Sequence, residues 1–145
     1  EPFSNDGASA EQPYRIQQEL QESMQRLVGI VRVQDEMEQA LEKVRELRAR
    51  AARVGVTGNR EYNPGWHTAL DLRNLLSYSE AIARAALERK ESRGAHARLD
   101  HPGKDETFGK RTIVIRQGRE GELQVAQEPL PEIPAELKKI IDEMK

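Results

Sequence analysis

The sequence contains no cysteine, which excludes disulfide bonds, thiolate metal sites and a cysteine nucleophile. Aromatic residues make up only 4% of the 145 residues, so a core must be built mainly from aliphatic side chains. No apolar run approaches the roughly 20 residues that a membrane-spanning helix needs, and we therefore expect no direct membrane insertion. The net charge of −2 offers no overall attraction to nucleic acid or to anionic lipid. These absences favour an elongated helical protein with a large charged surface.

Helical periodicity is present in three segments, where apolar residues recur at spacings of three and four. The first segment begins at Pro13 and extends to about Val33. The second has Asp35 as its expected cap and runs to Val54. The third opens at Asn63, and Gly94 is expected to end it in a left-handed conformation. We therefore predict an antiparallel, spectrin-repeat-like three-helix bundle over residues 13–94.

The two ends of the chain have different patterns. Residues 1–12 carry small and polar side chains with little to bury, which predicts a flexible linker. Residues 95–145 form a C-terminal extension, in which TIVI (112–115) and ELQV (122–125) flank the turn sequence GREG (118–121) and predict a short β-hairpin. Three prolines then keep the chain extended before a last short helix, AELKKIIDEM. The fold is thus predicted to be mainly α.

The stretch RKESRGAHARLDHP (89–102) is the strongest candidate for chemistry. A metal site at His96 and His101 is disfavoured, because Gly and Pro nearby prevent a helix from fixing their geometry. Ser92 lies outside any strand-to-helix elbow, which disfavours a nucleophile. Nucleic-acid binding is disfavoured as well, because no stacking aromatic residues accompany the arginine cluster at Arg45, Arg48, Arg50 and Arg53.

Two interpretations of this stretch remain open. In the first, Arg89 and Lys90 only complement the negative end of the third helix. In the second, charged residues form a hydrogen-bonded network between domains. Donors outnumber acceptors locally, so the missing acceptors are expected on another domain, and substitutions at Arg93 or Arg98 are expected to matter little without that domain. The candidates for the network are Arg89, Glu91, Arg93, His96, Arg98 and Asp100.

The string ESRGAHARLDHP, preceded by NLLSYSEAIARAALERK, resembles the C-terminal region of the succinate dehydrogenase/fumarate reductase flavoprotein subunit family. YRIQQELQESMQRLVGIVR and LEKVRELRAR are similar to the first two helices of that region. The resemblance covers the chain from about Pro13 onward, and its specific element is RGAH-x-R-x-D-x-P. Two positions depart from the family pattern: Phe108 stands where a Trp is common, and Lys110-Arg111 where Lys-His is common.

The resemblance implies an FAD-binding domain upstream, FAD in the parent subunit and an iron–sulfur partner subunit. It implies succinate–fumarate oxidoreductase activity for that parent, in the cytoplasm and peripheral to the membrane through the parent complex. The family's flavin-attachment and substrate-binding residues lie upstream, so no catalytic, cofactor-binding or metal residue carries over to this chain. The chain begins at Glu1, and we expect it to be an inactive fragment of a longer subunit. Two alternatives are the corresponding domain of L-aspartate oxidase and a stand-alone helical interaction module.

Overall fold

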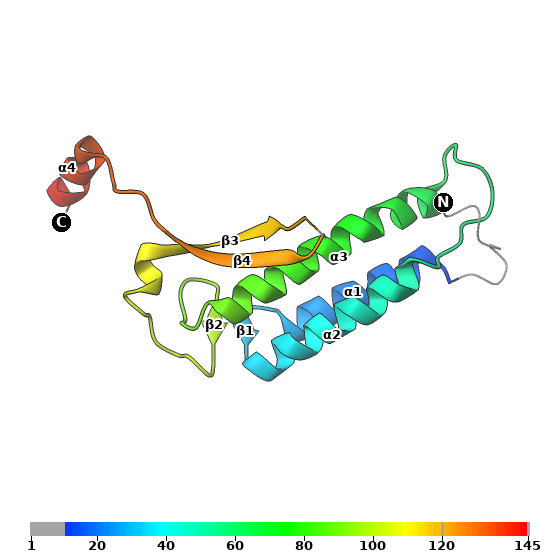
Figure 1. Ribbon diagram of the computed structural model, residues 1–145, viewed down its shortest axis with the longest axis horizontal. Coiled ribbons are helices and arrows are strands. Elements are labelled where there is room, and N and C mark those ends of the chain that lie inside the picture. The colour runs from blue at the N-terminus through cyan, green and yellow to red at the C-terminus, as the bar shows by residue number, and fades with distance from the viewer. Residues whose placement is uncertain (1–10, 120, 145) are drawn as a thin grey trace.

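The computed structural model describes residues 11–119 and 121–144, and over this range the chain is mainly helical, as predicted. Three long helices run along the long axis, and successive helices point in opposite directions (Figure 1). They are α1 (Pro13–Leu27), α2 (Gln34–Ala51) and α3 (Pro64–Glu88). A two-stranded antiparallel sheet lies beside α3, and a fourth helix, α4 (Ala135–Glu143), follows the sheet.

The predicted apolar stripes of the three long helices form the core, which is divided into two clusters. One cluster contains Ile16, Leu20, Val44, Leu47, Val54, Leu72 and Leu76. The other contains Leu27, Val28, Met37, Ala40, Ala83 and Ala86. Both clusters draw side chains from all three helices, and each large aliphatic side chain that is fully buried contributes about 1.5–3 kcal/mol. The helices are therefore held together along their whole length.

The start of α3 follows the sequence prediction. The Asn63 side chain accepts a hydrogen bond from the backbone N–H of Trp66 at 3.2 Å, and Pro64 occupies the first turn. The start of α2 does not. Its cap position is Val33, which makes no side-chain cap, so the assignment of this role to Asp35 is wrong.

The first helix ends at Leu27 and does not continue to Val33. A Cβ on Gly29 would lie 2.8 Å from the carbonyl oxygen of Gln25, so the backbone folds tightly against the end of α1 at a position that only glycine fits. Val31–Arg32 then forms the short strand β1, which pairs in parallel with β2 (Ala97–Arg98). The apolar residue Val31 belongs to this strand pair and not to the helix stripe.

The third helix ends at Glu88, six residues before the predicted end. Gly94 does adopt the left-handed conformation, with φ of +59°, but it does so inside the turn that follows the helix. Residues 89–94 are therefore released from the helix, and within them the Glu91 side chain turns inward and is buried.

The predicted hairpin is present and longer than expected. After a short 3-10 helix, η1 (Phe108–Lys110), strands β3 (Arg111–Gln117) and β4 (Leu123–Pro129) pair with Ile115 opposite Val125. Gln127 donates a 2.6 Å hydrogen bond to Glu88, which fastens the sheet to α3. The predicted turn GREG includes residue 120, which lies outside the described residues.

Most of the predicted linker lies outside the described residues as well. Its described part is anchored, because the Gly55 backbone N–H donates to the Glu11 carbonyl at 3.3 Å and the Arg50 Nε donates to the Glu11 carboxylate at 3.0 Å. Arg50 also bonds to Glu19 and Glu46, so it joins α1, α2 and the preceding segment. In the part of the chain that the structure describes, no helix combines the length and the apolar character that a bilayer crossing requires.

Candidate functional site: the charged turn

Residues 89–105, which we name the charged turn, fold back on themselves directly after α3. The backbone N–H of Ser92 donates to the Gly103 carbonyl at 2.9 Å, and the N–H of Arg93 donates to the His96 carbonyl at 2.9 Å. The Ser92 hydroxyl accepts from the Arg98 N–H at 2.8 Å and lies 2.8 Å from the His101 carbonyl. Ser92 therefore organises the turn through its hydroxyl, a role that sequence reasoning missed.

Arg98 lies at the centre of the charged turn, and its side chain is completely buried. Its Nη1 donates to the carbonyl oxygens of Ala86 and Leu87 at 3.0 and 3.3 Å, which belong to the last turn of α3. Its Nε and Nη2 donate to the two carboxylate oxygens of Asp100, each at 2.7 Å. A cation from the turn that follows α3 thus satisfies the end of that helix, where the helix dipole is negative.

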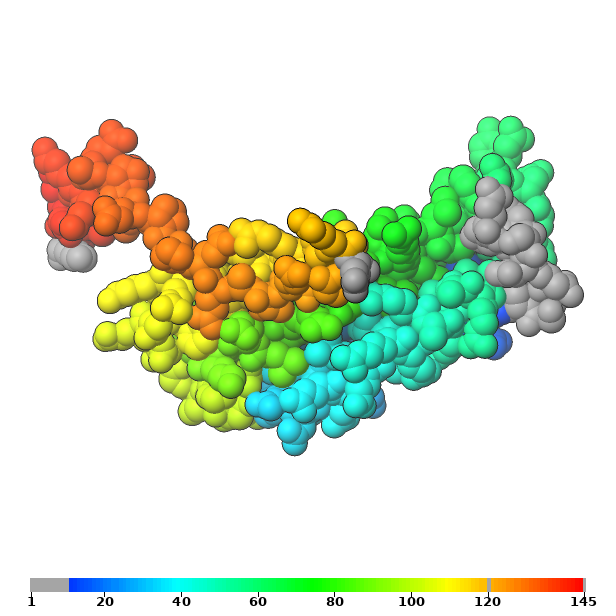
Figure 2. Space-filling model, in the orientation of Figure 1, coloured from blue at the N-terminus to red at the C-terminus, as the bar shows by residue number. Residues whose placement is uncertain are grey.

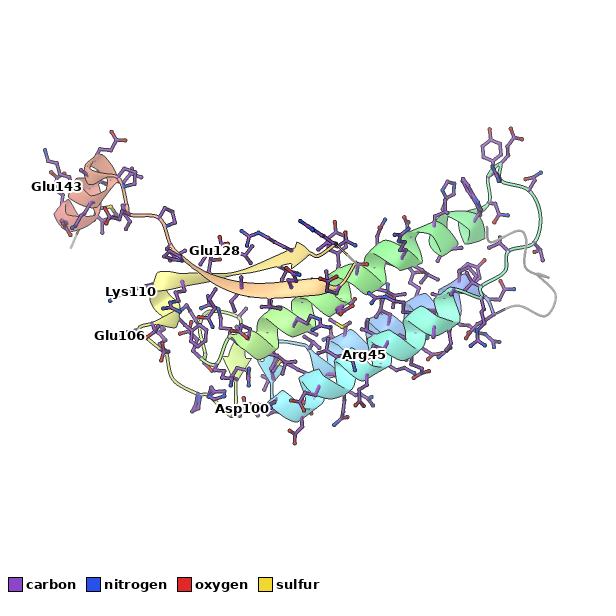
Figure 3. The ribbon with its side chains drawn as sticks, viewed as in Figure 1. Arg45, Asp100, Glu106, Lys110, Glu128 and Glu143 are labelled. Atoms are coloured by element: carbon purple, nitrogen blue, oxygen red, sulfur yellow. The ribbon has the colours of Figure 1, made fainter. Side chains whose placement is uncertain are left out.

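Asp100 connects this ion pair to a second helix. Its Oδ2 accepts from the backbone N–H of Gln34, the first residue of α2, at 3.1 Å. Figure 3 shows Asp100 beside that end of α2. The hydrogen bonds from Arg98 hold the pKa of the Asp100 carboxyl well below its ordinary range, and the helix N–H acts in the same direction. The carboxylate therefore complements the positive end of the α2 dipole.

Glu91 is the centre of a second group, and it is fully buried. Its carboxylate accepts from Arg93 Nε and Nη2 at 2.9 and 3.0 Å and from the Asp105 backbone N–H at 2.8 Å, and it is paired with Arg89 as well. These interactions, the Arg93 hydrogen bonds first, lower the pKa of Glu91 to about 2. A buried carboxylate with two arginine partners stays ionised and rigid.

His96 joins the charged turn to strand β1. Arg32 Nη1 lies 2.6 Å from His96 Nδ1, and the Arg89 carbonyl lies 2.9 Å from His96 Nε2. A guanidinium only donates and a carbonyl only accepts, so Nδ1 is the acceptor and Nε2 carries the hydrogen. Burial lowers the pKa of His96 below its ordinary value of 6.5, and the positive charge of Arg32 acts in the same direction. His96 is thus a neutral structural link.

The structure brings all six predicted residues into this one region, in two groups that meet at the main chain of Arg89. Arg98 and His96 both donate to the Arg89 carbonyl oxygen. The sequence led us to expect acceptors for Arg98 on another domain. This chain supplies them instead, through Asp100 and the carbonyl groups at the end of α3. Among the described residues no buried side-chain nitrogen or oxygen lacks a partner. Arg32 was missed because its segment was assigned to a helix, although Gly29 was a signal for an earlier end.

The outer face of the β1–β2 pair is apolar. Successive strand residues point to opposite sides, so the inward direction of Arg32 and Arg98 places Val31, Ala97 and Leu99 on the outward side. Val31 is 55% exposed and Leu99 is 67% exposed, whereas Arg98 is only 1% exposed. This inverts the usual arrangement, with charge inside and apolar side chains outside, and it indicates a surface suited to being covered.

The family resemblance implies FAD in the parent subunit, and the described residues of this chain do not have the features of a dinucleotide site. A dinucleotide phosphate is usually held by open backbone N–H groups after a glycine-rich turn at a helix start. Here α1 and α3 begin with proline, and the first N–H of α2 is bonded to Asp100. No glycine directly precedes α1, α2, α3 or α4. Among the described residues, no group of three or more His, Asp or Glu side chains is placed to hold a metal ion.

Comparisons with known proteins give consistent relatives. A family model described as "Fumarate reductase flavoprotein C-term" matches residues 17–139. The chain is 36% identical over 112 residues to the succinate dehydrogenase flavoprotein subunit of Coxiella burnetii, covering 76% of this chain and 19% of that protein. It is 30% identical over 115 residues to the L-aspartate oxidase of Streptomyces coelicolor, covering 79% of this chain and 20% of that protein. The solved structure "Mycobacterium smegmatis Sdh1 in complex with UQ1" superposes with a TM-score of 0.88 at 39% identity, covering 97% of this chain and 24% of that chain.

Proposed function

Because the chain belongs to the fumarate reductase flavoprotein C-terminal family, we propose that it is the non-catalytic C-terminal domain of a succinate dehydrogenase or fumarate reductase flavoprotein subunit. The chain spans about a fifth of the length of the curated relatives it matches. In this proposal the rest of the subunit binds FAD and interconverts succinate and fumarate. Electrons pass from FAD to an iron–sulfur subunit, and the complex lies in the cytoplasm at the periphery of a membrane. This chain contributes domain packing and subunit assembly.

The main structural support for a packing role is the apolar outer face of the β1–β2 pair. Val31 and Leu99 are exposed, whereas the side chain of Arg98 is buried and that of Arg32 is partly buried, and the hydrogen bonds of these two arginines hold the strand pair in place. A rigid apolar surface is favoured for packing because little conformational entropy is lost when it binds. In this proposal the outer face packs on the FAD-binding domain, and α1, α2 and α3 act as an antiparallel three-helix bundle that supports it.

The first test is the coding sequence that precedes Glu1. We expect it to contain a dinucleotide-binding fingerprint with closely spaced glycines after a strand. A coding sequence that starts at this chain would support the stand-alone helical module instead. The chain on its own is expected to bind no FAD and to turn over no succinate, and a yellow, flavin-loaded preparation of these 145 residues would contradict that expectation.

The second test places a charge on the outer face of the full-length subunit. Leu99→Asp is expected to lower the thermal stability of the subunit and its bound FAD, with an unchanged rate per remaining flavin. Leu70→Asp is the matched control, because Leu70 is an exposed leucine near the opposite end of α3. Equal effects of the two substitutions would show that the outer face is not part of the interface with the FAD-binding domain.

The corresponding domain of L-aspartate oxidase is a second candidate, supported by the Streptomyces coelicolor relative. The two candidates differ in the substrate of the full-length protein. Reduction of the flavin by L-aspartate, with none by succinate, would favour the oxidase.

A further inference from the structure

The last described residues form a separate structural feature, which we name the C-terminal arm (residues 130–144). The arm leaves the end of β4 as an extended segment and finishes in α4 (Figure 1). In the space-filling view α4 stands away from the body of the molecule and is joined to it by a narrow neck (Figure 2). The last backbone bond between the neck and the body is from the Leu130 N–H to the Lys110 carbonyl, at 2.9 Å.

The arm is unusually apolar for an exposed segment. It carries six large apolar side chains, each between 44% and 82% exposed: Leu130, Ile133, Leu137, Ile140, Ile141 and Met144. The last four recur at spacings of three, one and three, so they share one face of α4. A helix of nine residues is marginal in water without packing. The helical form of α4 therefore fits a bound state better than a free one.

The extended segment between β4 and α4 limits the positions that α4 can take. Pro129, Pro131 and Pro134 fix the backbone torsion φ at three of six positions and favour an extended, semi-rigid spacer. The arm projects from the end of the molecule that also holds the charged turn (Figure 1). Its apolar face is thus presented at the same end as the outer face of the β1–β2 pair.

The size of the arm limits the choice of partner. A stable interface between separate proteins uses roughly 20–30 residues on each side, and the arm has fewer and is only partly apolar. A contact within one polypeptide needs less area, because the tether raises the effective concentration of the binding segment. The family model extends to residue 139, within α4, and the Mycobacterium smegmatis superposition includes 97% of this chain although that chain is about four times as long. These observations favour an occupant in the remainder of the same subunit.

We propose that the C-terminal arm binds an apolar groove on the upstream part of its own polypeptide and holds that part against the helical domain. The inference rests on the proposed function, because it requires an upstream part. It adds a second attachment, independent of the outer face of the β1–β2 pair, through which the last residues of the chain hold the subunit together.

A photo-crosslinking residue at position 140 of the full-length subunit, within its assembled complex, tests the identity of the partner. We expect a crosslink to upstream peptides of the same chain, with no increase in mass on a denaturing gel. A crosslink to another subunit or to a second copy would overturn the proposal, and so would the absence of any crosslink. Failure of the proposed function is distinguishable, because it appears as a coding sequence without an upstream flavin-binding region.

Hydrogen exchange of residues 135–143 in the same complex tests whether the arm is bound. The wild-type amides are expected to exchange at least tenfold more slowly than in Ile140→Asp, which places a charge on the apolar face. Lys138→Asp is the matched control, because it introduces the same residue on the polar side of α4 and should keep the protection. Fast exchange in the wild type, or equal exchange in both variants, would overturn the proposal.

Discussion

Arg98 and Asp100 form a bidentate ion pair that connects the last carbonyl groups of α3 to the first N–H group of α2. The two helices have opposite dipole ends at this point, and each charge lies at the end that it complements. One pair of side chains therefore neutralises two helix termini at once. The contact between these two helix ends therefore depends on this pair more than it would on an exposed ion pair, which contributes little to stability.

Replacement of Arg98 by alanine is expected to destabilise this chain itself. The substitution leaves Asp100 and the terminal carbonyls of α3 without their partner, and removal of one member of a buried charged pair costs about 3–5 kcal/mol. Urea unfolding of the 145-residue chain measures the loss. Arg45→Ala, on the exposed surface of α2, is the control and should change the free energy by less than about 0.5 kcal/mol. A loss below about 1 kcal/mol for Arg98→Ala would restore the expectation that the residue acts only through another domain.

Glu91 should make stability depend on pH in the acid range. Its pKa is about 2 in the folded chain and near 4.5 when unfolded, so its contribution is fully present above pH 4.5 and is lost as the pH falls towards about 2. Glu91→Gln removes a charge that Arg89 and Arg93 require, and it should cost about 3 kcal/mol at neutral pH. The variant should also show a flatter stability curve between these pH values. Parallel curves for wild type and variant would show that another carboxylate is responsible.

His96 is expected to be neutral at pH 7, with its hydrogen on Nε2. Nitrogen-15 NMR of the imidazole ring distinguishes this tautomer from the Nδ1–H form. Because the folded pKa lies below 6.5, the histidine's contribution to stability is present above pH 6.5 and is lost as the pH falls through the folded pKa. Observation of the Nδ1–H tautomer would contradict the assigned bonds to Arg32 and to the Arg89 carbonyl.

Two glycines in the charged turn provide a matched comparison. A Cβ would meet nothing within 4 Å at either Gly94 or Gly103, but only Gly94 has a left-handed φ, of +59°. Gly94→Ala should therefore cost about 1 kcal/mol through backbone strain alone, whereas Gly103→Ala should be neutral or stabilise by up to about 0.5 kcal/mol. Thermal unfolding of the two variants measures the difference. Similar melting temperatures would indicate that the turn relaxes around residue 94.

The sequence predicted those features that depend on local chemistry. Asn63 and Pro64 determine where α3 begins, and the β-branched residues of TIVI determine a strand, because neighbours a few residues away decide both. The ends of α1 and α3 were misplaced for a different reason. Val31 fits a helical stripe equally well, and only its pairing with Ala97 makes it a strand residue.

The six residues predicted to form a network do lie in one region, but their internal arrangement was not predictable. A glutamate among arginines, such as Glu91, is usually a solvated surface residue, and only the folding of residues 89–105 buries it completely. The partners of Asp100 and His96 include Gln34 and Arg32, which are 66 and 64 positions away in the chain. Sequence periodicity contains no information about such distant contacts.

These long separations also affect the order of folding. Loops that join residues more than sixty positions apart are slow to close, so the contacts of the charged turn with Gln34 and Arg32 should form after α2 and α3 have paired. Interactions that form late are absent from the folding transition state, and weakening them mainly accelerates unfolding. Arg98 holds Asp100, which makes one of these contacts, so in kinetic measurements Arg98→Ala should raise the unfolding rate and leave the folding rate nearly unchanged. The contacts at the two helix ends would then control the unfolding rate, and so the lifetime of the native state. A slower folding rate in this variant would instead place these contacts in the folding nucleus.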